Sequence, residues 1–243
     1  MKILAIDAGN TRIKWGWAEE GRWVRASWLA TAEARTLGGA LQGLPMPDRT
    51  VVSNVAGSAV GEDIASALAL SGAVPLWIQS ESHRCGVRSG YDDPGQLGSD
   101  RWAALIGAWH LFRGPCVVAN AGTTLTVDAL TGDGLFLGGL VVPGIDLMRA
   151  ALAGNTAQLA RQEGSFTYFP ARTGDAIMSG AINALAGAVE RMLRYMAEAG
   201  EADALVVLSG GGRAPLAARL NARVEVVDNL VLEGLACIAL DSP

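Results

Sequence analysis

The chain has 243 residues, of which 50% are hydrophobic and 18% are charged, so a folded core is expected and an intrinsically disordered chain is excluded. The formal net charge of -5, without any run of basic residues, argues against a nucleic-acid partner and favours a small molecule. The 3 cysteines form no CxxC pair and no apolar run reaches the ~20 residues of a membrane span, so we expect a cytoplasmic protein without a membrane partner.

The first predicted element is a β-hairpin at residues 4–23, LAIDAGNTRIKWGWAEEGRW. An apolar strand runs into a short turn, and a strand of alternating character follows it. Residues 117–136, VVANAGTTLTVDALTGDGLF, repeat this pattern, and the ungapped match aligns Asp7 with Asn120. Because the match preserves turn glycines together with the strand pattern, it indicates an internal duplication.

Helices and further strands follow the hairpin in each half of the chain. A helix is predicted to begin near Ser99, where bulky apolar residues recur at helical spacing, and a long helix is predicted over residues 173–200. Together with apolar strands in both halves, this order favours mixed sheets covered by helices. The predicted fold is therefore α/β, with an N-terminal domain at residues 1–113 and a C-terminal domain at residues 114–243.

The turn DAGNTRIK, residues 7–14, places the Asp7 carboxylate at the end of a buried strand. Such a turn can offer backbone N–H groups and hydroxyls to phosphate oxygens, while the carboxylate holds a hydrated Mg²⁺. The alternative is an Asx turn in which Asp7 caps its own backbone. The second copy, NAGTTLTVD at residues 120–128, favours phosphate binding, because two such turns could clamp one nucleotide.

The segment LGSDRW, residues 97–102, combines Asp100 and Arg101 at the start of the predicted helix. An acid in the first helical turn is favoured by the helix dipole, so Asp100 is explained equally well as a purely structural residue. Arg101 opposes the same dipole, which indicates a functional demand. An Asp that accepts a proton beside an Arg that holds an anion suits an acidic substrate with a hydroxyl group.

In these motifs, and in Tyr91 and GGLVVPG at residues 138–144, the chain resembles type III pantothenate kinases, relatives of the Bvg accessory factors. The resemblance runs from residue 1 to about residue 236. It implies duplicated ribonuclease-H-like domains of the acetate and sugar kinase, Hsp70 and actin superfamily, assembled as a homodimer. It also implies ATP-dependent phosphorylation of pantothenate to 4'-phosphopantothenate, the first step of coenzyme A synthesis.

The resemblance also implies roles for single residues. Asp100 would be the catalytic general base. The residues that would bind MgATP are Asp7, which would also hold the Mg²⁺, Ala8, Gly9, Asn10, Thr11, Arg12, Ile13, Lys14 and Thr123. The residues that would bind pantothenate are Tyr91, Gly98, Ser99, Asp100, Arg101 and Thr173.

One position departs from the family pattern. Where relatives often carry an Asp proposed to bind a monovalent cation, this chain has Asn120, which would have to bind K⁺ or NH₄⁺ through an uncharged amide oxygen. Two other functions stay open: another small-molecule kinase of the same fold, and a regulatory, transcription-related accessory protein without a kinase role.

Overall fold

The computed structural model describes residues 1–155 and 163–241, and the chain forms two compact units. The first unit comprises Met1–Arg113 with Asn229–Pro243, and the second comprises Gly114–Asp228. Within the described residues, no helix is long and apolar enough to cross a membrane.

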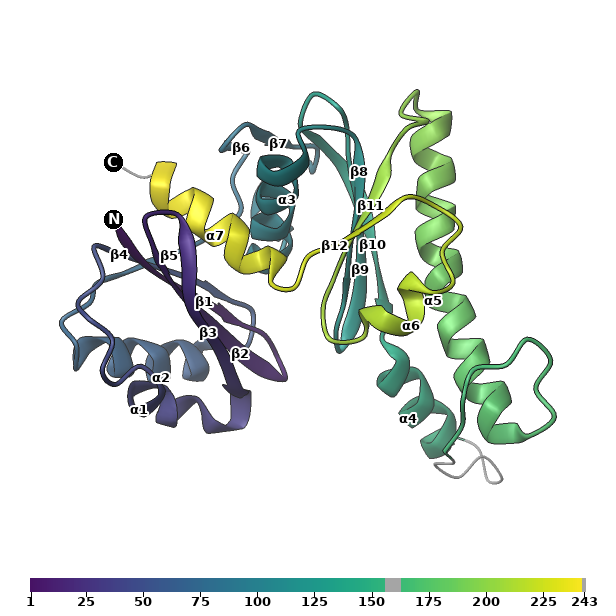
Figure 1. The fold of residues 1–243 in the computed structure, drawn as a ribbon, viewed down its shortest axis with the longest axis horizontal. Helices are drawn as coiled ribbons and strands as arrows, with labels where there is room; N and C mark the ends of the chain where they lie inside the picture. Colours follow the sequence, from purple (N-terminus) through teal and green to yellow (C-terminus); the bar gives the residue numbers. More distant parts are fainter. Residues whose placement is uncertain (156–162, 242–243) are drawn as a thin grey trace. The chain divides into compact units, whose positions relative to one another are not determined.

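The first unit is built on a five-stranded sheet in the order β3-β2-β1-β4-β5 (Figure 1). Strands β1 and β2 form the predicted hairpin, β3 continues it, and β4 lies parallel to β1 on the other side. The strands span Lys2–Ala8 (β1), Arg12–Glu19 (β2), Arg22–Ala30 (β3), Arg49–Asn54 (β4) and Pro75–Trp77 (β5). A short hairpin of His83–Arg84 (β6) and Val87–Ser89 (β7) precedes helix α3.

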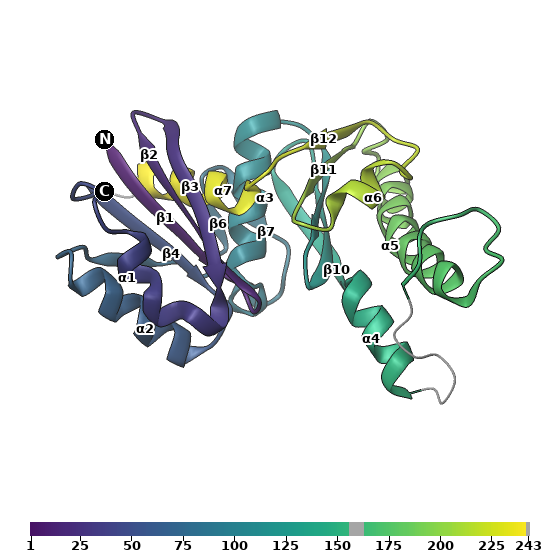
Figure 2. The ribbon, with the colours of Figure 1, turned by 60° about the horizontal axis from the view of Figure 1, so that its bottom comes forward.

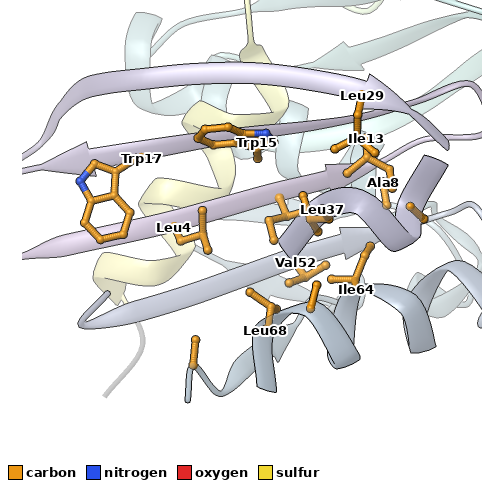
Figure 3. Packing of buried hydrophobic residues seen from close by; sticks show 14 residues of the cluster. Leu4, Ala8, Ile13, Trp15, Trp17, Leu29, Leu37, Val52, Ile64 and Leu68 are labelled. Carbon is orange, nitrogen blue, oxygen red and sulfur yellow. The ribbon is translucent and has the colours of Figure 1, made fainter. Parts of the chain in front are cut away.

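Helices cover both faces of this sheet. Helices α1 (Leu37–Ala40) and α2 (Ser58–Ala69) lie on one face, and α3 (Ser99–Phe112) and α7 (Leu230–Asp241) lie on the other (Figure 2). Alternate residues of β1 and β2 point toward α1 and α2, where Trp15 and Trp17 are buried with Leu4 (Figure 3). The opposite set, which includes Asp7, therefore faces α3 and α7.

The second unit repeats the same order of elements. Strands β8, β9 and β10 form an antiparallel meander, β11 lies parallel to β8, and β12 lies parallel to β11. They span Cys116–Ala121 (β8), Thr124–Leu130 (β9), Leu135–Pro143 (β10), Leu205–Ser209 (β11) and Val224–Val226 (β12). The helices are α4 (Ile145–Asn155), α5 (Thr173–Glu198), which packs on this sheet, and α6 (Arg213–Ala217).

The predicted duplication is confirmed, but the two hairpins differ at the turn. Asp7 pairs with Lys14 across the first hairpin, whereas Asn120 pairs with Thr126 across the second. The second turn is therefore one residue shorter, so the ungapped sequence match is out of register along β2 and β9.

The C-terminal helix α7 belongs to the first unit, whereas the sequence-based division placed all of 114–243 in the second. Two contacts explain this. The Trp23 indole N–H donates to the Glu233 carboxylate at 2.7 Å, which joins β3 to α7. Gly107 of α3 also lies against the backbone of α7, since a Cβ there would meet the Leu230 carbonyl oxygen at 2.6 Å.

Candidate active site

A row of polar side chains crosses three strands of the first sheet on the face that carries α3 and α7. Lys14 of β2 is directly opposite Asp7 of β1, and Ser53 of β4 is in register with Asp7 on its other side. Residues in register on neighbouring strands share a face, so these three side chains lie side by side. Earlier in these strands, residues on the same face are apolar and buried, as Ala5 of β1 and Val51 of β4 are.

Asp7 is the central group of this row, and it is only 8% exposed. Its Oδ1 atom is buried without a hydrogen-bond partner among the described residues. The pKa of the Asp7 carboxyl is raised to about 7, mainly by burial and also by the negative charge of Asp100, while the positive charge of Lys14 opposes the rise. The charges of Asp7 and Asp100 therefore affect each other, and the Oδ1 atom of Asp7 accepts no hydrogen bond from the described residues.

The turn after Asp7 is held closed by its own backbone and by Thr31. The Gly9 N–H donates to the Arg12 carbonyl at 3.0 Å. The Thr31 hydroxyl donates to the Gly9 carbonyl at 2.6 Å, and the Thr31 N–H donates to the Thr11 carbonyl at 3.0 Å. These bonds fix the turn in one conformation, with the side chain of Asn10 exposed at its tip.

The predicted phosphate-binding residues of this turn divide by burial. The side chains of Thr11 and Arg12 are exposed, and the Arg12 guanidinium lies 4.2 Å from the centre of the Trp28 ring. Ala8 and Ile13 are fully buried in the core, so only their backbone groups can contact a ligand. Lys14 is half-buried beside Asp7, where its ammonium group adds positive charge to the site.

Helix α3 begins at Ser99, as predicted, and places Asp100 in its first turn. The Asp100 carboxylate accepts the Arg101 N–H at 2.8 Å. Burial raises the pKa of the Asp100 carboxyl, while that backbone bond and the Arg101 charge oppose the rise. A Cβ at Gly98 would meet the Asp100 carboxylate at 2.7 Å, so a larger residue at this position would clash with the carboxylate. A carboxylate with a raised pKa is closer to the range in which a general base works best.

Arg101 and Tyr91 form a second part of the site. The Arg101 guanidinium donates to the Tyr91 hydroxyl at 3.3 Å and lies 6.0 Å from the centre of its ring. Both side chains are half-buried. A guanidinium held beside a phenol can grip a carboxylate with two parallel bonds.

The remaining predicted residues, Asn120, Thr123 and Thr173, belong to the second unit. Asn120, next to the last residue of β8, is half-buried and is in register with Ser209 of β11, as Asp7 is with Ser53. Thr123 is exposed in the second hairpin turn, and its carbonyl accepts the Gly144 N–H at 2.9 Å. Thr173 is the exposed first residue of α5.

Three polar residues of this region were not singled out by sequence reasoning: Ser53, Ser80 and Thr31. Ser53 and Ser80 are buried and bond to the residues that precede or begin α3, and Thr31 closes the turn after Asp7. The only signal for Ser53 was its place at the polar end of the apolar strand TVVSN, which resembles the end of β1 at Asp7. Ser80 and Thr31 follow no such pattern, because their bonds are made only in the folded unit.

The residues present fit a magnesium–nucleotide complex. In the described chain no three His, Cys, Asp or Glu side chains come together as a protein-only metal site. Mg²⁺ instead binds through one or two carboxylates, with water and substrate phosphates completing its shell. The buried, unpartnered Oδ1 of Asp7 supplies an oxygen of that kind.

Comparisons with solved structures show the fold. A ROK family glucokinase from Streptomyces griseus, solved with glucose and AMPPNP, matches with a TM-score of 0.59 at 14% identity, covering 100% of both chains. The Acidaminococcus fermentans (R)-2-hydroxyglutaryl-CoA dehydratase component A matches with a TM-score of 0.58 at 14% identity, covering 99% of this chain and 96% of that one. The chain has the duplicated fold of the acetate and sugar kinase, Hsp70 and actin superfamily.

Sequence comparison is more specific. Residues 3–195 match the family model described as type III pantothenate kinase. The type III pantothenate kinase of Aromatoleum aromaticum is 51% identical over 237 residues, which cover 98% of this chain and 97% of that protein. Together with the Asp7 and Asp100 motifs, these matches show that the chain belongs to the type III pantothenate kinase family.

Proposed function

We propose that this chain transfers the γ-phosphoryl group of ATP to the primary hydroxyl of pantothenate, with Asp100 as the general base. Its family membership makes it a pantothenate kinase of coenzyme A biosynthesis. The observation that supports the role of Asp100 is its partly buried carboxylate, with a raised pKa, close enough to Asp7 to raise the pKa of that group as well.

The two parts of the site suit the two substrates. The turn from Asp7 to Lys14 would bind the ATP phosphates. Arg101, beside the Tyr91 hydroxyl, would grip the pantothenate carboxylate, and Gly98 and Ser99 would complete that pocket. Because both substrates are anionic, the cations Lys14 and Arg101 reduce their mutual repulsion.

The reaction then needs little covalent chemistry from the protein. The pantothenate hydroxyl oxygen bonds to the γ-phosphorus, the bond from that phosphorus to the bridging oxygen of ADP breaks, and Asp100 takes the hydroxyl proton. Positioning and charge neutralisation provide most of the rate enhancement in such transfers. Mg²⁺, when bound with ATP, would neutralise developing charge on the phosphates, and Asp7 is the residue that would hold it.

Two finer proposals accompany this function. Asn120 would be a weakened monovalent-cation site, since its amide oxygen can coordinate K⁺ or NH₄⁺ without supplying a charge. We also propose a cytoplasmic location, supported by the free thiols of Cys85, Cys116 and Cys237.

The test is ATP turnover by the purified chain against pantothenate, sugars and short carboxylates, with Asp100→Asn as the variant. We expect pantothenate to be the preferred acceptor and the variant to lose roughly 10²- to 10⁴-fold in kcat, the range for a lost general base. The KM for ATP should change little, because the amide keeps the size of the side chain. Near-normal turnover would reduce Asp100 to a helix-start residue.

The acceptor panel separates the alternatives. A strong response to a sugar and none to pantothenate would indicate another kinase of the same fold. No turnover with any acceptor would favour an accessory protein without kinase activity. Arg101→Lys serves as the matched substrate control, because it keeps the charge but removes the bidentate grip, and it should raise the KM for pantothenate rather than for ATP.

A further inference from the structure

Two buried serines hold the chain where it enters α3. The Ser80 hydroxyl donates to the Leu97 carbonyl at 2.6 Å, and the Ser53 and Ser99 hydroxyls bond to each other at 2.9 Å. Ser53 is fully buried, and Ser99 is only 8% exposed. Neither Ser53 nor Ser80 contributes to the reaction as described so far.

We propose that Ser53 is a positioning residue that fixes Asp100 relative to Asp7, an inference that rests on the proposed role of Asp100 as the base. Ser53 is in register with Asp7 on the neighbouring strand, so the two side chains start from fixed points on one rigid sheet. The Ser53–Ser99 bond then ties that sheet to the residue immediately before Asp100. The hydrogen bond between Ser53 and Ser99 thus connects the residue beside Asp7 in the sheet with the residue that precedes Asp100.

Among the described residues, few other hydrogen bonds hold the start of α3 in this place. Its N-cap residue is Gly98, which has no side chain to bond the first turn. Asp100 bonds only to the helix to which it belongs, through the Arg101 N–H, so that bond does not fix the helix against the sheet. Of the hydrogen bonds described for Ser99 and Asp100, the one from Ser99 to Ser53 reaches the sheet.

The chemistry makes this placement sensitive. A general base must lie within hydrogen-bond reach of the hydroxyl whose proton it takes, and a displacement of about 1 Å can cost 10²-fold in rate. Removing the Ser53 hydroxyl leaves the buried Ser99 hydroxyl without its hydrogen-bond partner. The loss favours a movement of the start of α3 that gives Ser99 another partner. The same change leaves the turn at Gly9 and the carboxylate of Asp7 in place.

The experiment combines Ser53→Ala with Ser99→Ala in a double-mutant cycle. We expect Ser53→Ala to lower kcat about 10-fold, a partial form of the misplacement cost, with the KM for ATP within about 2-fold of the wild type. In the Ser99→Ala background the same substitution should change kcat less than about 1.5-fold, because the bond is already absent. Unchanged kcat for Ser53→Ala, or an equal loss in both backgrounds, would overturn the proposal.

A control variant separates positioning from general loss of stability. Ser71→Ala removes a 2.8 Å hydroxyl bond to the Leu68 carbonyl at the end of α2, in the same unit and away from the acids. It should keep wild-type kcat, and a loss equal to that of Ser53→Ala would also contradict the inference. Turnover is measured with whichever acceptor the panel identifies. If the preferred acceptor is not pantothenate, the proposed function is refuted, but the effect of Ser53→Ala on kcat can still be measured with that acceptor.

Discussion

The buried carboxyl of Asp7 makes the stability of the first unit depend on pH. Its pKa is raised from 3.8 to about 7, first by burial and then by the charge of Asp100. The folded unit therefore binds the Asp7 proton more tightly than the unfolded chain does. This contribution to stability is fully present below pH 4 and is lost as the pH rises through 7.

Asp7→Asn tests this linkage, because the amide stays neutral at every pH. We expect the variant to gain stability relative to the wild type by about 2 kcal/mol between pH 5.5 and pH 8, from the slope of about 1.36 kcal/mol per pH unit below the raised pKa. All seven tryptophans lie in the first unit, so urea unfolding followed by tryptophan fluorescence reports this unit. A difference that stays constant with pH would show that Asp7 is ionised throughout.

Asn120 is the counterpart of Asp7 in the second unit, and its amide brings no charge to the end of β8. If it coordinates a monovalent cation, Asn120→Asp should reach half-maximal activation at lower K⁺, since a carboxylate binds a cation more strongly than an amide does. Activity is titrated with KCl, and choline chloride keeps the ionic strength constant. Identical K⁺ curves for the two proteins would leave Asn120 as a turn residue only.

At the scale of elements, the close approach of α3 and α7 decides the shape of the first unit. A Cβ at Gly234 would overlap the backbone carbonyl of Ala103, and one at Gly107 would meet the Gly234 nitrogen at 2.9 Å. Backbone atoms cannot move aside as a flexible side chain can. Glycine at these positions therefore permits the packing that brings α7 back to the first unit.

Gly234→Ala should consequently destabilise the first unit by about 3 kcal/mol or more, at the upper end of the cost of overpacking. The matched control is Gly187→Ala in α5, where a new Cβ meets nothing within 4 Å. That change should be neutral or stabilise its helix by up to about 1 kcal/mol, because alanine is the better helix former. Thermal unfolding by circular dichroism compares the two, and equal melting temperatures would mean that α7 can shift to make room.

Helices α3 and α5 were predicted near their observed bounds because their signals are local. Apolar spacing, an upstream proline and a downstream glycine mark the ends of α5, which the structure places at Thr173–Glu198. The ungapped alignment of the two hairpins is wrong along β9 for a different reason. Strand register depends on the length of the turn, and a turn that is one residue shorter shifts every following pair.

At the scale of the whole molecule, the apolar residues of α5 pack inside the chain and so are not available for a dimer interface. Ile182, Leu185 and Val189 are buried inside the chain, the latter two in the core of the second unit. Other apolar groups of this unit stay exposed: Tyr168 is 79% and Phe169 is 95% accessible. Exposed apolar groups of this kind are available to a homodimer interface.

We still expect a homodimer, as the family resemblance implies, because two-fold pairs are the commonest closed assemblies. Light scattering at the concentration used for the assay should give twice the 25.1 kDa mass of one chain. Activity should fall on dilution below the dissociation constant if the assembly is needed for turnover. A mass of 25.1 kDa with full activity would reject the requirement.

The sequence by itself determined the duplicated α/β fold, the hairpin turn after Asp7 and the helix start at Asp100, because strand alternation, turn glycines and helix ends depend on neighbouring residues. The tertiary structure alone decided that α7 joins the first unit, that Ile13 serves the core, and that Ser53 bonds to Ser99. These depend on contacts between residues as far as 210 positions apart, such as Trp23 with Glu233. Side-chain burial and long-range hydrogen bonds arise only when the strands and helices pack, so no local sequence pattern predicts them.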